Sequence, residues 1–373
     1  MNVERVISIA NVVNDDLSQI GLVQRLQELQ NALANQINSP NEGNLQMVGQ
    51  SRKEVMAALE RSNFDYLPTT WRSSLEELGL TNRLGAGLAS GLNDSFEASQ
   101  SILTDVQSYV AVVQDDVSTI DEQLKAVASN LVAMGLKADH LEPGQAELSF
   151  LIPRDAIDNG LTKLAKEISF FDKAVRAFSE IEEGKPDAPE LRQLSTTDPA
   201  IFALVGTGTV LAFLKIVKEI ICVIEKSYKM REARASAIAA EMDTEIIEKM
   251  NAQIELAIEQ GLENVTEMAT RRLDSRVGRS KELKNAAKLY IGGLAARIDN
   301  GFQVDGSAVP SDEEKEEQML DAEDERGHQI TTSEEVNTIS SEIRFAELPE
   351  ESILRLAYDG EEEEGDQVGT EGA

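Results

Sequence analysis

The apolar positions between Leu92 and Met134 follow a heptad pattern. They recur at alternating steps of four and three residues, with one polar position. A strict 3.5-residue period keeps one face of a helix against a partner and implies left-handed supercoiling. The pattern predicts a single helix roughly 65 Å long, at about 1.5 Å per residue. Its seam comprises Leu92, Phe96, Ser99, Leu103, Val106, Val110, Val113, Val117, Ile120, Leu124, Val127, Leu131 and Met134.

Two other regions repeat this alternation. One is predicted to be a helix opened by Pro153 and Asp155, and the other begins near the N-terminus. Several segments with matching seams favour a helical bundle, here an elongated bundle or antiparallel coiled coil, over isolated rods. The two seams are Ile157, Leu161, Leu164, Ile168, Phe171, Val175 and Phe178, and Val6, Ala10, Val13, Leu17 and Ile20 followed by Leu22, Leu26, Leu29 and Leu33.

The longest predicted helix begins at Asp198. Asp198 is a favourable N-cap, and Pro199 fits the first helical position. No proline or glycine occurs between Leu211 and Gln260, which indicates one helix of about fifty residues or more. A step of four residues makes an apolar stripe wind around its helix and meet different neighbours. This stripe comprises Ile238, Met242, Ile246, Met250, Ile254, Ile258 and Leu262.

The start of this helix carries no charge from Ala200 to Leu214. A membrane-spanning helix needs about 20 predominantly apolar residues, and this run is shorter and includes "GTGT" from Gly206. We expect a buried turn of a helix in a soluble protein, approached closely by a neighbour at its small residues. Insertion into a bilayer after a conformational change is the second interpretation, and a constitutive span is the third. The residues expected at this buried or membrane contact are Ala203, Leu204, Thr207, Gly208, Val210 and Ala212.

Breaks in the periodicity divide the chain into five segments. The three glycines of "LGAGLASGLND" from Leu84 indicate a hinge or a close helix crossing. The run from Glu147 to Ile152 is strand-like and could form a small hairpin or edge. No other strand is convincing, so the predicted fold class is all-α. The segments are 1–82 (helical), 83–142 (heptad helix), 143–190 (strand-like turn and heptad helix), 191–298 (long helix with a basic end) and 299–373 (acidic tail).

Composition adds an acidic tail to this picture. The net charge is −32, and residues 299–373 hold 24 acids against four bases. Few apolar residues and many charges predict a largely disordered tail. A field of this sign disfavours nucleic acid as a partner. A short helix near 345–358 interrupts the tail and either docks on the body or is a motif that a partner binds, through Phe345, Ile353, Leu354, Leu356 and Tyr358.

A basic segment precedes the tail, between Thr270 and Lys288. Three interpretations stay open: a solvated helix face, an internal contact with the acidic tail, or a site for an external anion. Because the Debye length is about 8 Å at physiological salt, a tail in contact with this segment would mask it. Its cations are Arg271, Arg272, Arg276, Arg279, Lys281, Lys284 and Lys288.

Candidate catalytic chemistry is sparse. Cys222 is the only cysteine, and His140 and His328 are the only histidines. These residues form no recognisable catalytic or metal-binding set, and "GTGT" is expected inside a helix instead of after a strand, where phosphate loops lie. We therefore expect no cofactor and no enzyme. A lone cysteine and a start without a secretory signal predict a cytoplasmic protein.

The predicted function is that of a non-catalytic scaffold or assembly protein. It would act through coiled-coil self-association or partner binding, as a homo-oligomer with protein partners. Long heptad helices around one concealed apolar segment also resemble the plan of α-helical pore-forming toxins. That resemblance implies a membrane-active protein in which residues 200–214 insert. The third hypothesis is an anion-binding regulator masked by its acidic tail.

Overall fold

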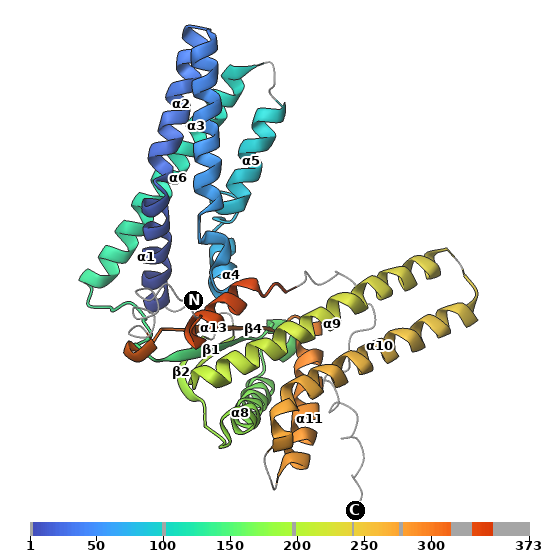
Figure 1. Ribbon diagram of the computed structural model, residues 1–373. Helices are drawn as coiled ribbons and strands as arrows, with labels where there is room; N and C mark the ends of the chain where they lie inside the picture. Colours follow the sequence, from blue (N-terminus) through green and yellow to red (C-terminus); the bar gives the residue numbers. More distant parts are fainter. Residues whose placement is uncertain are drawn as a thin grey trace, which may run out of the picture. The chain divides into compact units, whose positions relative to one another are not determined.

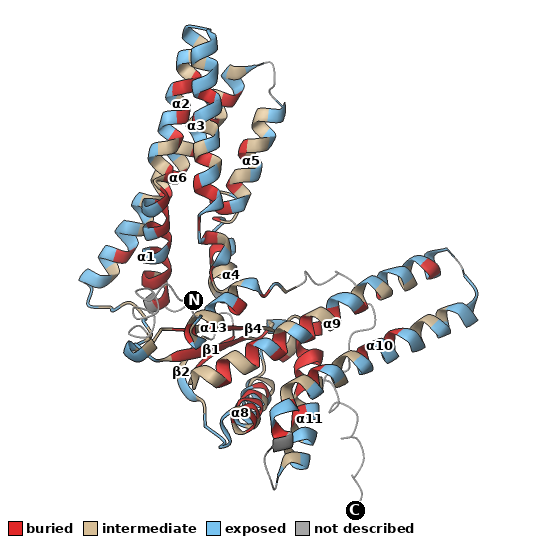
Figure 2. Cartoon of the chain, viewed as in Figure 1, coloured by how far each residue is buried: buried red, intermediate tan, exposed pale blue. Residues whose placement is uncertain are grey.

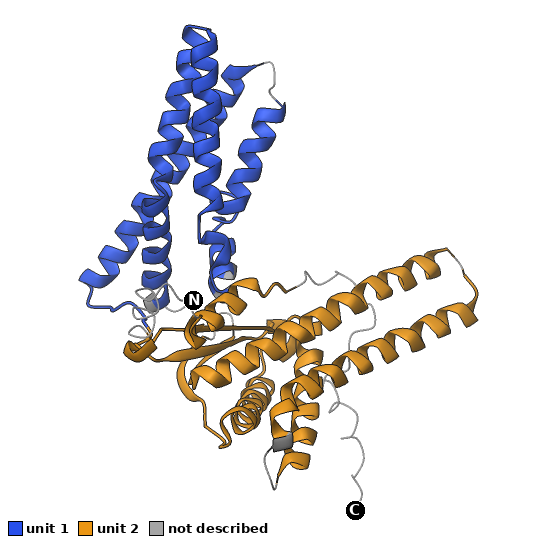
Figure 3. Ribbon diagram, viewed as in Figure 1, with its two compact units in different colours: residues 1–140 blue, residues 141–373 orange. Residues whose placement is uncertain are grey.

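The computed structural model describes residues 3–98, 102–195, 199–240, 242–275, 279–314 and 330–345. The chain divides into two compact units, residues 1–140 and 141–373 (Figure 3). Most of the described chain is helical, but the second unit also contains a four-stranded sheet. The prediction of an all-α fold is therefore wrong for the second unit.

Unit 1, residues 1–140, consists of helices, the first two of which run end to end in the same direction (Figure 1). Gly21 joins the first two helices in the left-handed region, at φ 62°, and both helices pack along the last one. Its elements are α1 (Val3–Ile20), α2 (Leu22–Asn38), α3 (Glu42–Glu60), the 3-10 turn η1 (Phe64–Tyr66), α4 (Thr69–Glu77), α5 (Gly85–Ala98) and α6 (Leu103–Ala133).

The heptad seam supplies the core of unit 1, but not as one helix. Val106, Val110 and Val117 are buried in α6, whereas Val127 and Met134 of the same seam are 40% and 77% exposed. The helix expected to be continuous is interrupted at Ile102, whose φ of −130° and ψ of 81° are not helical, so α5 and α6 are separate helices. Gly91, one of the three glycines for which a hinge or a close helix crossing was expected, has a side chain of α6 as its neighbour. A Cβ atom there would lie 2.4 Å from the hydroxyl oxygen of Tyr109 in α6.

Unit 2, residues 141–373, builds an antiparallel sheet with strand order β2-β3-β1-β4. Ala146 at the start of β1 lies opposite Val205 of β3 and Ala308 of β4. The elements are β1 (Ala146–Leu151), α7 (Arg154–Ile157), α8 (Leu161–Glu183), β2 (Glu190–Ser195), β3 (Ala200–Val205), α9 (Thr207–Ala239), α10 (Thr244–Thr270), η2 (Arg271–Ser275), α11 (Ser280–Asp299), β4 (Gln303–Ala308) and α13 (Thr332–Glu342).

The uncharged run expected to be helical from its start begins with the internal strand β3. Pro199 and Gly206 bracket six residues rich in strand-forming side chains, and short apolar runs of this kind fit a buried strand as well as a helix. Hydrogen bonding to β1 and β2 on its two sides makes β3 a strand. Asp198, the expected N-cap, lies outside the described residues. Gly206 thus follows a strand, so the placement of "GTGT" inside a helix is also wrong.

The predicted helix of about fifty residues is an antiparallel hairpin of α9 and α10. Asp243 opens α10 by accepting a hydrogen bond from the N–H of Glu245 at 3.2 Å. A stripe that winds around a straight helix cannot stay covered by one neighbour, whereas the hairpin buries Ile254 and Ile258. The predicted heptad helix from Pro153 is also interrupted, because Asp158 and Asn159 adopt positive φ angles between α7 and α8.

Part of the region predicted to be a disordered tail belongs to the fold of unit 2. Val304 of β4 and Val336 of α13 are fully buried in the same core as the sheet. Thr331 and Glu334 form a capping box that begins α13. The tail boundary at 299 is therefore wrong. Residues 315–329 and 346–373 of the acidic segment lie outside the described residues.

Unit 2 concentrates the few aromatic side chains of the protein. Phe150 stacks on Phe171 with ring centroids 4.9 Å apart, and Phe178 meets Phe213 edge to face at 5.4 Å. Aromatic pairs of this geometry stabilise a core beyond the area that they bury. The rings therefore form the part of the core that lies between the sheet, α8 and α9.

Candidate functional site

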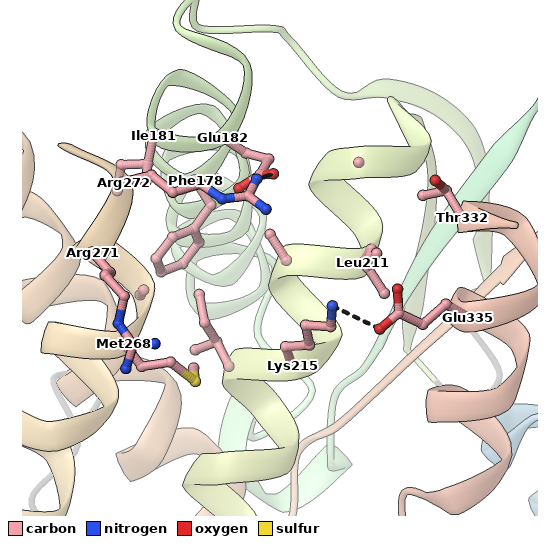
Figure 4. A pocket seen from close by; sticks show the side chains of 14 residues that line it. Phe178, Ile181, Glu182, Leu211, Lys215, Met268, Arg271, Arg272, Thr332 and Glu335 are labelled. Carbon is pink, nitrogen blue, oxygen red and sulfur yellow. Dashed lines mark hydrogen bonds and ion pairs between the residues drawn. The ribbon is translucent and has the colours of Figure 1, made fainter. Parts of the chain in front are cut away.

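A groove of about 550 Å³ lies on unit 2 between α8, α9, the end of α10 and α13 (Figure 4). Gly208 and Ala212 keep the α9 side of the groove low because their side chains are small. The lining residues are Phe178, Ile181, Glu182, Gly208, Leu211, Ala212, Lys215, Ile216, Met268, Ala269, Arg271, Arg272, Thr332 and Glu335.

The floor of the groove is apolar and comes from three helices. Leu211 of α9, Phe178 of α8 and Met268 of α10 contribute to it. Helical spacing brings Leu211, Ala212 and Lys215 to one side of α9, which places a cation beside the apolar floor. The groove therefore offers apolar contact in its depth and charge at its edge.

The rim carries cationic side chains that differ in whether they form an ion pair. Lys215 forms an ion pair with Glu335 of α13 at 2.8 Å, and Arg272 pairs with Glu182 of α8 (Figure 4). Arg271 is exposed at the same rim, and it has no ion-pair or hydrogen-bond partner among the described residues. Arg271 is therefore available to a carboxylate or another anion from outside the chain.

The N-terminus of α9 beside the groove is occupied by a side chain of the protein itself. Thr209 donates a hydrogen bond to Oε1 of Glu183 at 2.9 Å. A Cβ atom at Gly206 would lie 2.5 Å from the same carboxylate oxygen. Helix N-termini attract anions, and here Glu183 fills that position. The glycines of "GTGT" thus make room for an internal carboxylate.

The structure distributes the predicted basic set over several environments. Arg279 pairs with Glu180 of α8 at 2.9 Å and with Glu282 at 3.0 Å. The hydrogen bond to Glu282 and the charge of Glu180 raise the pKa of Arg279. Lys281 and Lys284 are exposed on α11, and Arg276 lies outside the described residues.

Lys288 forms the clearest ion pair of this set. Its Nζ lies 2.7 Å from Glu263 of α10. Its hydrogen bond to Glu263 raises the pKa of Lys288, and the same bond lowers the pKa of Glu263. The ion pairs described for this basic set are with acids of α8, α10 and α11.

The residues predicted for a buried or membrane contact also separate. Ala203 and Leu204 belong to β3, and Val210 is fully buried beside Gly306 of β4. Thr207 begins α9. Gly208 and Ala212, by contrast, line the groove together with Arg271 and Arg272, so two sets that were predicted independently meet at one site.

The predicted partner motif is only partly described. Phe345 packs half-buried against the core of unit 2. Ile353, Leu354, Leu356 and Tyr358 lie outside the described residues.

Two buried ion pairs at the end of α11 were not predicted from the sequence. Asp299 accepts two hydrogen bonds from Arg231 of α9, at 2.7 and 3.1 Å. Arg297 binds Glu167 of α8 at 2.6 Å and lies over the ring of Phe170. One feature of the sequence could have indicated the first pair. Arg231 lies seven residues after Ile224 and therefore falls on the same face of the helix as the apolar side chains.

The described residues contain no cluster of three His, Cys, Asp or Glu side chains that could hold a metal ion. Cys222 is half-buried beside a second cavity of about 340 Å³ between α9 and α10. Within the same described part, each helix is too short or too polar to cross a membrane. No family model, curated protein or solved structure matches the chain.

Proposed function

We propose that the protein is a non-catalytic assembly protein that binds an acidic, amphipathic segment of a partner protein in the groove of unit 2. The observation that carries this proposal is the combination of an apolar floor with Arg271 at the rim. Amphipathic helices bind apolar grooves through one face and leave charged residues at the edge. The exposed Arg271 selects partners that carry a carboxylate there.

A peptide of defined sequence tests the proposal before the natural partner is known. Residues 347–364 of this chain combine an aliphatic cluster, Ile353 to Leu356, with four consecutive acids at its end. We expect this peptide, labelled with a fluorophore, to bind the full-length chain in 0.15 M salt. The control peptide replaces Ile353, Leu354, Leu356 and Tyr358 by serine and so keeps the charge. Equal binding of both peptides would contradict a role for the apolar floor.

Two charge reversals locate the binding site. Arg271→Glu changes the rim without breaking a described ion pair, and we expect affinity to fall about tenfold, or about 1.4 kcal/mol. Lys281→Glu makes the same change in charge outside the groove, where we expect less than about a threefold effect from screened attraction. Ala212→Trp fills the floor and should abolish binding while the circular dichroism spectrum is retained. Equal effects of the two reversals would exclude the groove.

A shortened chain removes competition from the protein's own acidic segment. The truncation must follow Phe345, because a deletion from 299 would also remove β4 and α13. If the segment after Phe345 occupies the groove within the chain, the shortened protein binds the peptide more tightly than the full chain does.

A further inference from the structure

The groove of unit 2 continues outward along the α9–α10 hairpin. The second cavity of about 340 Å³ adjoins it as an outer cavity, since Met268 lines both. In the described part of the chain, the residues that line the outer cavity all belong to α9 and α10. Figure 2 shows this outer part of the hairpin as mostly exposed or half-buried. The outer cavity is therefore a surface hollow between two helices without a third.

The groove and the outer cavity use one face of α9. A series of their lining residues follows at steps of four and three residues, and such steps return to the same side of a helix. From Gly208 to Met230 the lined face extends for about 33 Å, at about 1.5 Å per residue. These residues of α9 are Gly208, Ala212 and Lys215 in the groove, and Glu219, Cys222, Lys226 and Met230 in the outer cavity.

The facing helix has the same spacing. Along α10 and just past its end, the series runs through Ala257, Gly261, Asn264, Met268 and Arg271, again at steps of four and three. A Cβ atom at Gly261 would lie 2.7 Å from the side chain of Val223, so the two helices meet closely at this level. Two helices whose bordering residues both keep a heptad spacing offer a seam to a third helix.

The seam combines half-buried apolar side chains with exposed charges. Val223, Met230 and Met268 are half-buried along it, and methionine side chains adapt to irregular partner surfaces. Arg271 is exposed at the inner end. Lys226 is exposed at the outer end, and it has no ion-pair or hydrogen-bond partner among the described residues. The seam therefore favours an apolar helix face with an acid near each end.

The spacing of these two cations fits a single helix. Counted from the contact between Gly261 and Val223, Arg271 reaches the level of Phe213, thirteen residues before Lys226. That separation is about 20 Å along the hairpin. On a helix, two residues twelve positions apart are about 18 Å apart along the axis and about 120° apart around it. They therefore lie on opposite flanks of an apolar face, as Arg271 and Lys226 come from the two different helices that border the seam.

We propose that the groove and the outer cavity together bind one helix of about twenty residues from the partner protein. The helix carries apolar residues at heptad spacing, one acid opposite Arg271 and a second acid opposite Lys226. A base one heptad from the second acid meets Glu219, which is exposed seven residues before Lys226. The bound helix completes a three-helix bundle with α9 and α10 over this length. The inference rests on the proposed function and adds the outer cavity to its site.

A designed peptide of three heptads tests the charges at the two ends. It carries leucine at each a and d position, glutamates on opposite flanks twelve residues apart, and a lysine seven residues before the second glutamate. Its binding to the full-length chain is followed by fluorescence anisotropy, with the labelled peptide kept dilute. We expect Arg271→Glu and Lys226→Glu each to weaken binding about tenfold, whereas Lys281→Glu, outside both cavities, changes it less than about threefold. Replacing the second glutamate of the peptide by lysine should restore the affinity for Lys226→Glu to within about threefold of the original pair.

A matched pair of tryptophan variants tests the outer cavity itself. Ala257→Trp fills this cavity, and we expect binding to weaken about tenfold or more, because a filled pocket cannot receive an anchoring side chain. Ala252→Trp makes the same change at another exposed position of α10, outside both sets of lining residues. It should change the affinity less than about threefold. Both variants should keep the circular dichroism spectrum of the wild-type protein.

The outcomes separate this inference from the proposed function. If Arg271→Glu weakens binding but Lys226→Glu and Ala257→Trp match their controls, the partner uses the groove alone and the inference is overturned. If the peptide binds only a chain that ends at Phe345, the protein's own acidic segment is the occupant, which also overturns the inference. If the peptide binds neither chain, or if Arg271→Glu has no effect, the proposed function fails together with the inference.

Discussion

Removing one carboxylate from the end of α11 should destabilise unit 2 more than removing any surface charge. Asp299 is fully buried and Arg231 is 3% exposed, so the pair has almost no access to water. Asp299→Asn keeps the shape of the side chain but leaves the guanidinium without its counter-charge. Breaking a buried ion pair on one side costs about 3–5 kcal/mol, because the remaining charge is buried and uncompensated.

Replacing both partners should cost much less than replacing one. In the double variant Arg231→Met and Asp299→Leu, no buried charge remains. The Nε of Arg231 has no hydrogen-bond partner in the described structure, so the native pair is itself incompletely satisfied. Apolar replacements of buried pairs of similar volume are often neutral or stabilising. We therefore expect the double variant to unfold within about 1.5 kcal/mol of the wild-type protein.

Urea unfolding followed by circular dichroism measures these differences. Glu245→Gln is the control, because Glu245 and Lys249 form an ion pair in which both side chains are at least 70% exposed. Such pairs are worth about 0–1 kcal/mol. The reasoning would be refuted if Asp299→Asn lay within about 1 kcal/mol of the wild-type protein, or if the double variant were as unstable as the single one. A biphasic curve would be analysed by transition, since two units need not unfold together.

Two further predictions concern packing and pH. Gly87→Ala should destabilise unit 1 by about 1–3 kcal/mol in urea unfolding, because a Cβ atom there would lie 2.2 Å from the backbone oxygen of Thr81. Gly49→Ala, in open space on α3, should instead stabilise by about 0.5–1 kcal/mol; similar effects at both glycines would contradict the close approach of Gly87 to Thr81. The ion pair of Glu263 with Lys288 should contribute stability above pH 4.5, the usual pKa of the carboxyl, and lose it as acid titrates Glu263 through its lowered pKa. At the alkaline end, the contribution should persist to pH 10.5 and disappear through the raised pKa of Lys288. Carboxyl NMR titration checks this, since Lys288→Met should return the Glu263 midpoint toward its usual value.

The sequence predicted which side chains are buried better than it predicted where helices begin and end. The seam residues from Val106 to Ile120 form the core of unit 1, as the heptad pattern indicated. The pattern alone did not reveal the break between α5 and α6, because the apolar spacing continues across the polar position Ser99. The spacing of apolar residues identifies the buried face of a helix. It does not locate a break when the apolar spacing is the same on both sides of that break.

The larger errors arose where local pattern and long-range pairing compete. Ala200 to Val205 carries no charge, and nothing local distinguishes a buried strand from a buried helix at this length. Its outcome was decided by β1, about fifty residues earlier, which pairs with it along its whole length.

The groove was unpredictable for the same reason. Gly208 lies far in the sequence from Arg271, and the hairpin that returns α10 to the start of α9 brings them together. The N-cap at Asp243 was not predicted from the sequence. Without it, neither the α9–α10 hairpin nor the groove that the end of α10 lines could be predicted. Once the turn at Asp243 is known, the winding stripe from Ile238 to Leu262 acquires a simple explanation. Its inner residues Ile254 and Ile258 are buried, whereas its outer residues Ile238, Met242 and Ile246 lie near the turn of the hairpin and are 41–44% exposed.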